Sequence, residues 1–268
     1  MQQITPELAQ LLAERYPDVS SDYWQKIDLT RAFEDQMYDG NDPEYWSMAH
    51  YLGTGMEATR LIKSSLTLIN RSPEEVKDIL DFPCGFGRVL RHLKVGFPNS
   101  NIIGSEIFQN CLDFCSNQFK IGTFLSDKNF NIRSERNFDV IWCGSLFTHL
   151  SSTRFDKLIK FFESQLKEDG IMIFTVHGRF SRHNIDNIRY QLSRPRILQM
   201  KIGYETTGYG YTNYNNSDSY GLTFIKLSWL AKYFDRNPNL KIVGHYERGW
   251  DNIQDVIVLQ KQNVYKIS

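Results

Sequence analysis

The 268-residue sequence lacks several features that would assign it to a special class of protein. No apolar run approaches the roughly 20 residues of a membrane-spanning helix, and the N-terminus lacks the basic and apolar stretches of a signal peptide. The four cysteines form no CxxC pair, so we expect the reduced thiols of a cytoplasmic protein and no metal site. Basic and acidic residues number 31 each, and this zero net charge argues against a nucleic-acid-binding protein.

What the sequence does contain is an alternation of short apolar strands with helices. We predict strands at 79–83, 101–107, 121–126, 138–145 and 171–176, with helices between most of them. Such alternation through short links is typical of a parallel sheet with right-handed crossovers. Two last strands, at 240–247 and 254–260, are joined by a link too short for a helix and should pair antiparallel. The sequence therefore predicts an α/β fold with a mostly parallel, seven-stranded sheet and an antiparallel C-terminal hairpin.

Two segments fall outside this alternation. Residues 1–75 have helical patterns, including one over about 22–37, and we predict a helical N-terminal cap on a domain that spans 76–268. The alternation lapses again over 178–226, which we interpret as a lid inserted over the substrate.

The stretch ILDFPCGFGRVLRHL, residues 79–93, is a strand that breaks at two glycines and restarts as a helix. Gly85 and Gly87 allow the backbone to approach a ligand closely, at the strand end where open α/β sheets bind ligands. A dinucleotide motif would have a third glycine where Leu90 stands, and no GK[ST] follows, which excludes a P-loop. Glu106, at the end of the second strand, can accept hydrogen bonds from both hydroxyls of a ribose. The ligand is therefore a nucleoside compound, and an NAD-dependent oxidoreductase remains open at this point.

Four motifs occur in the order found in class I S-adenosylmethionine-dependent methyltransferases: LDFPCGFGRVLRHL, IIGSEI, FDVIWCGSLFTHL and LKEDGIMIFTVHG. The sequence resembles this family over about 75–177, and by its predicted topology over 227–261. The resemblance implies a Rossmann-like fold and an enzyme whose cofactor is S-adenosyl-L-methionine.

The family pattern D/E-x-G-x-G-x-G is matched at Asp81, Gly85 and Gly87, whereas Pro83 replaces the first glycine and removes an N–H donor. This departure keeps open a non-catalytic module that binds an adenosyl ligand. By resemblance, Glu106 would hold the ribose and Asp127 the adenine. The full set of cofactor-binding residues implied is Asp81, Phe82, Pro83, Gly85, Gly87, Arg88, Glu106, Ile107, Asp127, Gly144 and Ser145.

The residues that meet the methyl acceptor are sought among histidines and tyrosines. A general base is needed only if the acceptor is a hydroxyl or a protonated amine, and our candidates are His149, His177 and Tyr211. Residues 204–220 contain no aliphatic side chain and resemble adaptable recognition loops. The tyrosines predicted to bind substrate there are Tyr204, Tyr209, Tyr211, Tyr214 and Tyr220.

These features favour an acceptor that is a small molecule, a sugar, or a glycan or natural-product precursor, methylated on oxygen or nitrogen. A peptide or protein acceptor is the alternative. Six basic residues between 179 and 201 either bind an acceptor phosphate or form a solvated helix face. They are Arg179, Arg182, Arg189, Arg194, Arg196 and Lys201.

Overall fold

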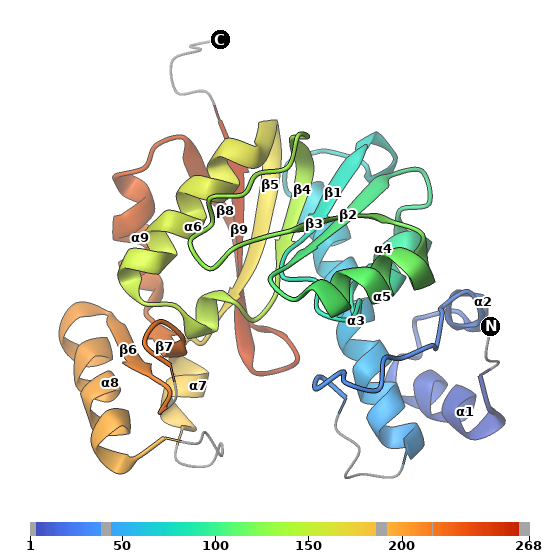
Figure 1. Ribbon diagram of the computed structural model, residues 1–268, viewed down its shortest axis with the longest axis horizontal. Helices are drawn as coiled ribbons and strands as arrows, with labels where there is room; N and C mark the ends of the chain where they lie inside the picture. The colour runs from blue at the N-terminus through green and yellow to red at the C-terminus, as the bar shows by residue number, and fades with distance from the viewer. Residues whose placement is uncertain (1–3, 39–43, 186–191, 216, 263–268) are drawn as a thin grey trace.

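The computed structural model describes residues 4–38, 44–185, 192–215 and 217–262. A seven-stranded sheet in the order β3-β2-β1-β4-β5-β9-β8 forms its centre (Figure 1). Its strands are β1 (Asp78–Asp81), β2 (Asn101–Glu106), β3 (Gly122–Leu125), β4 (Phe138–Cys143), β5 (Leu166–Val176), β8 (Leu240–Trp250) and β9 (Gln254–Lys261). Strands β1 to β5 are parallel, and β9 runs antiparallel to both β5 and β8. The predicted Rossmann-like sheet with its antiparallel C-terminal hairpin is confirmed.

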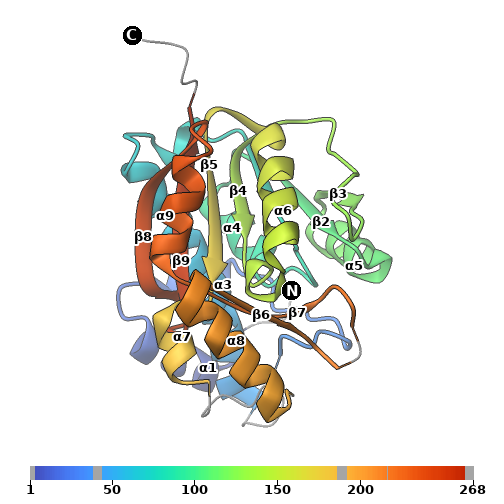
Figure 2. The same cartoon turned by 90° about the vertical axis from the view of Figure 1, so that its left-hand side faces the viewer.

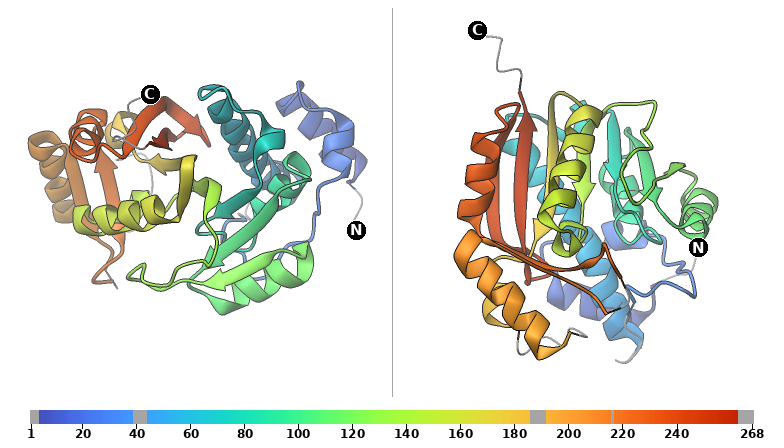
Figure 3. Two further views of the ribbon diagram at one scale, coloured as in Figure 1. Left: turned by 90° about the horizontal axis from the view of Figure 1, so that it is seen from above. Right: turned by 60° about the vertical axis from the view of Figure 1, so that its left-hand side comes forward.

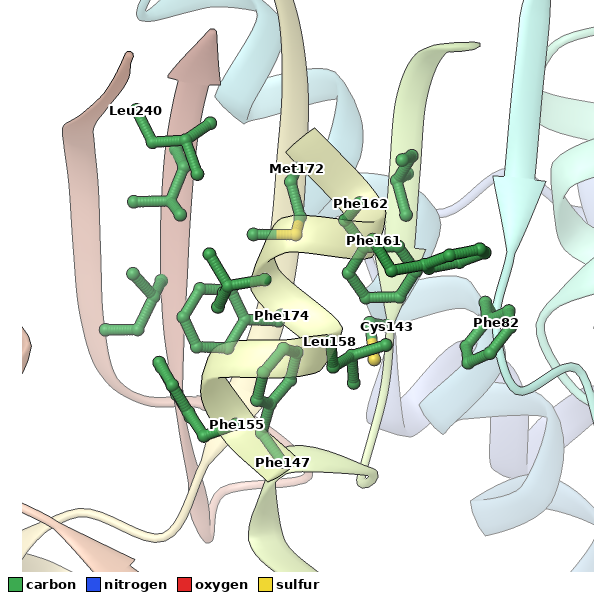
Figure 4. Close-up of a cluster of buried hydrophobic side chains, with 14 of the residues drawn as sticks. Phe82, Cys143, Phe147, Phe155, Leu158, Phe161, Phe162, Met172, Phe174 and Leu240 are labelled. Carbon is green, nitrogen blue, oxygen red and sulfur yellow. The ribbon is translucent and has the colours of Figure 1, made fainter. Parts of the chain in front are cut away.

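Helices cover both faces of this sheet, as the view from above shows (Figure 3, left). One face is covered by α3 (Glu44–Thr67), α4 (Leu90–Gly96) and α5 (Gln109–Phe119), which bury aliphatic side chains such as Ile62 and Leu93. The other is covered by α6 (Ser152–Gln165) and α9 (Leu227–Asp235). On that face α6 contributes Phe155, Leu158 and Phe162 to an aromatic-rich core (Figure 4). These three positions recur at helical spacing, which is why the sequence predicted an amphipathic helix there.

The N-terminal region comprises α1 (Pro6–Arg15), α2 (Ser21–Gln25) and α3. The predicted helix over 22–37 was wrong, because only Ser21–Gln25 is helical. Beyond it, aspartate side chains accept backbone N–H groups: Asp28 Oδ1 from Thr30 (2.8 Å) and Asp35 Oδ1 from Met37 (3.0 Å). Such local bonds compete with helix formation. The treatment of residues 1–75 as a separate cap remains a prediction.

The inserted segment contains α7 (Arg179–His183), α8 (Arg194–Thr207) and an antiparallel hairpin of β6 (Tyr209–Asn213) and β7 (Gly221–Ile225). Its own small core includes Met200, Tyr204 and Phe224. The hairpin extends across the end of the sheet (Figure 2 and Figure 3, right). The insertion thus lies at the same end of the molecule as α1 and the start of α3 (Figure 1). None of the described helices combines the length and the apolar character that crossing a membrane would require.

Candidate active site

A cavity of about 560 Å³ opens at the carboxyl ends of the central strands. This volume falls within the range of about 300–1,000 Å³ that is usual for small-molecule sites. Eleven of the residues predicted from sequence line it: Asp81, Phe82, Pro83, Gly85, Arg88, Glu106, Ile107, Gly144, Ser145, His149 and Tyr220. The cavity therefore unites the ends of β1, β2 and β4 with the tip of the inserted hairpin.

The two glycines of the turn after β1 have different surroundings. Gly85 has a φ of +50°, and a Cβ added there would meet no atom within 4 Å, so its face is open. Gly87 has a φ of +80°, but a Cβ there would lie 2.3 Å from the buried ring of Phe119. Both positive φ values favour glycine. Only Gly85 lines the cavity, whereas Gly87 allows the turn to pack against α5.

Backbone N–H groups hold the Glu106 carboxylate beside this turn. Its Oε2 accepts a hydrogen bond from the Gly85 N–H (3.3 Å), and its Oε1 accepts one from the Ile107 N–H (2.6 Å). Burial raises the pKa of Glu106, and these backbone N–H groups act in the opposite direction. Because each carboxylate oxygen has two lone pairs, both can accept a further hydrogen bond from a diol.

Two ionisable side chains near the turn lack the partners that buried polar groups usually have. Asp81 is 1% exposed, and its Oδ2 has no hydrogen-bond partner. Burial raises the pKa of Asp81 well above its usual value. The Arg88 guanidinium lies 5.3 Å from the centroid of the Trp250 ring and forms no ion pair with any described residue. Burial lowers the pKa of Arg88. A buried polar atom without a protein partner is rare, and at the lining of a cavity a bound ligand can supply that partner.

The residues after β4, Gly144 and Ser145, also line the cavity. Ser145 adopts a positive φ of 60°, which is uncommon outside glycine. Its N–H donates to Thr175 Oγ1 (2.8 Å), and its Oγ accepts from Gln254 Nε2 (2.9 Å). Side chains of β5 and β9 thereby hold this turn in place beside the cavity.

His149 lines the cavity with a defined tautomer. Its Nδ1 lies 2.7 Å from the Gly221 carbonyl oxygen, which can only accept, so Nδ1 carries the proton. Nε2 of the neutral ring is therefore the free base. Burial lowers the pKa of His149, which favours the neutral form. The Tyr220 ring stacks on the imidazole at 4.6 Å between centroids, and the Tyr214 hydroxyl lies 3.2 Å from Nδ1.

The other residues predicted to be catalytic or to bind substrate do not line the cavity. His177 is buried with its ring 6.5 Å from that of His149, and burial lowers the pKa of His177 to about 3. Tyr209 donates to the Leu150 carbonyl oxygen (2.7 Å), and the Tyr211 hydroxyl donates to Asn213. Tyr204 is in the core of the insertion. None of these residues, nor Tyr214, lines the cavity, so they shape the hairpin that carries Tyr220.

Asp127 and those basic residues of 179–201 that the structure describes also lie away from the cavity. The Asp127 carboxylate accepts three backbone N–H bonds within its own loop, and its neighbour Ser126 lines the cavity instead. Arg179 pairs with Glu247, and Arg182 with Glu205, so these two arginines are neutralised locally. Arg189 lies outside the described residues.

The sequence missed several lining residues. Asp35, Gln36 and Met37 come from the irregular N-terminal segment, for which the sequence offered no signal beyond a wrongly predicted helix. Trp250 could have been found: β8 runs parallel to β1–β5, so its last residue reaches the same edge of the sheet as theirs. The predicted strand ended at residue 247 and stopped short of it.

A family model described as "Methyltransferase domain" matches residues 54–202, more than half of the chain. The chain belongs to this methyltransferase family. No curated protein matches it. S-adenosyl-L-methionine is the methyl donor of the class I methyltransferases that the motifs resemble, so the predicted family, enzyme class and cofactor agree with this result.

Solved structures share the fold of this methyltransferase at low sequence identity. An S-adenosylmethionine-dependent methyltransferase from Clostridium acetobutylicum ATCC 824 has a TM-score of 0.55 at 16% identity, over 77% of this chain and 92% of that one. CalS10 from Micromonospora echinaspora, an amino pentose methyltransferase solved with S-adenosylmethionine, has a TM-score of 0.54 at 13% identity, over 84% and 99%. Magnesium protoporphyrin IX methyltransferase from Synechocystis PCC 6803, solved with S-adenosylhomocysteine, has a TM-score of 0.53 at 10% identity, over 94% and 99%.

Proposed function

We propose that this methyltransferase transfers the methyl group of S-adenosyl-L-methionine to an oxygen or nitrogen of a small molecule, such as a sugar or a natural-product precursor. The methyl donor would bind in the cavity beside Gly85, and the acceptor would bind next to His149 and Tyr220, which both line the cavity. The amino pentose and porphyrin methyltransferases with the same fold have small-molecule acceptors, which supports this choice.

The cavity residues fit the donor group by group. Arg88, a cation without an ion pair among the described residues, suits the carboxylate of the amino-acid end. Glu106 offers lone pairs on both oxygens to the ribose hydroxyls. A Cβ at Gly85 would project into open space, so the absence of a side chain there leaves room for a ligand. Pro83 lines the cavity without closing it.

When bound, S-adenosylmethionine supplies a methyl group already activated on a sulfonium, so the protein's task is mainly alignment. His149 supplies the one further function that a hydroxyl acceptor requires. Its free Nε2 would take the hydroxyl proton, while Nδ1–H stays bonded to the Gly221 carbonyl oxygen at 2.7 Å. The fixed tautomer of this cavity-lining imidazole is the observation that carries the proposal.

The hairpin tip and the turn after β4 bring hydroxyl groups to the cavity, whose lining also includes the cations Lys128 and Arg154. The hairpin tip contributes Ser217, Ser219 and Tyr220, and the turn after β4 contributes Ser145. Aromatic rings beside small hydrogen-bonding groups suit a polyhydroxylated acceptor such as a sugar. Because Tyr220 also stacks on His149, an acceptor that contacts Tyr220 would lie next to the base.

The test is release of S-adenosylhomocysteine from S-adenosylmethionine in the presence of a panel of neutral sugars, glycosides, phenols, amines and peptides. We expect turnover with a hydroxyl or amine small molecule, and its loss when His149 is replaced by glutamine. Turnover with peptides alone would refute the acceptor class, and binding without turnover of any acceptor would favour a non-catalytic module.

We also propose a cytoplasmic location. All four cysteines, Cys84, Cys111, Cys115 and Cys143, are free thiols. Unpaired cysteines are usual in reducing compartments.

A further inference from the structure

The irregular segment 26–38, which lies outside the sheet, contributes three consecutive lining residues to the cavity: Asp35, Gln36 and Met37. Asp35 is the only one of them with a charge, and it is 5% exposed. The question is whether this carboxylate only shapes its own loop or also binds a ligand.

Asp35 is tied to the glycine turn through two buried side chains. The Tyr51 hydroxyl in α3 donates to Asp35 Oδ2 (2.6 Å) and accepts from Arg91 Nη2 (3.3 Å). Arg91 in α4 donates from Nε to the Gly87 carbonyl oxygen (3.2 Å) and from Nη1 to the Asp28 carbonyl oxygen (2.7 Å). These hydrogen bonds therefore fix the position of the segment relative to the glycine turn beside the cavity.

The position of Asp35 complements that of Arg88. Both line the cavity, and Asp35 is among the acids whose charges act on the Arg88 guanidinium. Arg88 nevertheless forms no ion pair within the described ranges of the chain. Asp35 accepts hydrogen bonds from the Tyr51 hydroxyl and the Met37 N–H, which fix its orientation and leave a lone pair on each oxygen. A cation and an anion that face one cavity without pairing suit a zwitterion, whose carboxylate meets the first and whose ammonium meets the second.

We propose that Asp35 is a cofactor-binding residue that accepts a hydrogen bond from the α-ammonium group of S-adenosylmethionine, and that Tyr51 positions it. This assignment rests on the proposed function, because it requires the donor to bind in this cavity. It gives the N-terminal segment a direct part in donor recognition, separate from that of the sheet.

The test compares two ligands that share the nucleoside. S-adenosylhomocysteine carries the amino-acid end, whereas 5′-methylthioadenosine lacks it. Both are titrated by calorimetry into the full-length protein and into the Asp35→Asn variant, whose amide keeps the shape of the side chain and whose single oxygen can accept from either the Tyr51 hydroxyl or the Met37 N–H. We expect Asp35→Asn to weaken the binding of S-adenosylhomocysteine at least about tenfold and that of 5′-methylthioadenosine less than about twofold. Only S-adenosylhomocysteine has the ammonium group whose charge-assisted hydrogen bond to Asp35 would be lost.

Two further variants separate binding from folding. Tyr51→Phe removes only the hydroxyl and should produce a smaller loss that is again confined to S-adenosylhomocysteine. Asp28→Asn is the matched control: Asp28 lies in the same segment and accepts from Gln118 Nε2 (2.6 Å), but it does not line the cavity. Its two affinities should equal those of the unaltered protein.

Equal losses for both ligands in Asp35→Asn, or unchanged affinity for S-adenosylhomocysteine, would overturn the assignment. If Asp35→Asn does not fold, the assignment is instead overturned when Tyr51→Phe binds S-adenosylhomocysteine with unchanged affinity or binds both ligands equally more weakly. Failure of the unaltered protein to bind S-adenosylhomocysteine would instead refute the proposed function, so the two failures are distinguishable.

Discussion

The two glycines after β1 belong to one motif, yet replacing them with alanine should give opposite results. At Gly85 an alanine meets only the cost of a positive φ, about 1–2 kcal/mol, because its Cβ points into open space. At Gly87 the same cost is joined by an overlap with Phe119 at 2.3 Å. Overpacking of a core adds about 1–3 kcal/mol, so Gly87→Ala should lower the free energy of unfolding by about 2–5 kcal/mol in total.

The ligand-binding result should be the reverse. The methyl group of Gly85→Ala projects into the cavity, where it would overlap the bound ligand. If this overlap costs about 1.4 kcal/mol or more, the binding of S-adenosylhomocysteine is weakened at least about tenfold. Urea unfolding and calorimetric titration of each variant measure the two effects separately. The reasoning is refuted if Gly85→Ala binds S-adenosylhomocysteine as tightly as the unaltered protein, or if Gly87→Ala is as stable as Gly85→Ala.

Three further predictions concern other parts of the molecule. His149→Gln should reduce turnover by about 10²–10⁴-fold without changing donor affinity, and turnover of the unaltered enzyme should fall only as the pH drops below the lowered pKa of His149, as initial rates across pH would show. Trp250→Phe should cost about 1–3 kcal/mol in urea unfolding, because its indole N–H donates to a carbonyl oxygen of α3 at 2.9 Å. Burial acts to raise the pKa of Asp139, but hydrogen bonds from Lys167 and Arg71 outweigh burial and lower this pKa from 3.8 to about 2. The stability that this carboxylate adds is therefore present above pH 3.8 and lost as the pH falls toward 2, so Asp139→Asn should destabilise the protein at pH 7 and much less at pH 2.

The sheet could be predicted because each strand is a local pattern. A strand such as 138–143 is buried along its whole length, so its sequence is apolar at every position except Asp139, and this identifies the strand without its neighbours. The spacing of strands and helices then fixes the parallel connections. The cofactor side of the site followed from this, since the carboxyl ends of parallel strands meet at one edge.

The parts that could not be predicted depend on contacts between distant residues. Nothing local distinguishes Gly85 from Gly87, because the difference is the ring of Phe119, about thirty residues later in the chain. The path of residues 26–38 depends on Arg91 and Tyr51, which hold it from two other helices. Likewise, the tyrosines of 204–220 cannot be told apart by composition, yet Tyr204 and Tyr209 are buried, Tyr211 and Tyr214 are half-buried, and Tyr220 lines the cavity.

The most direct test of the central claim is a crystal structure of the protein with S-adenosylhomocysteine. We expect the ligand in the cavity beside Gly85, with its ribose hydroxyls on the Glu106 carboxylate and its amino-acid end between Arg88 and Asp35. A ligand bound elsewhere, or a cavity that stays closed to it at saturating concentration, would contradict the account.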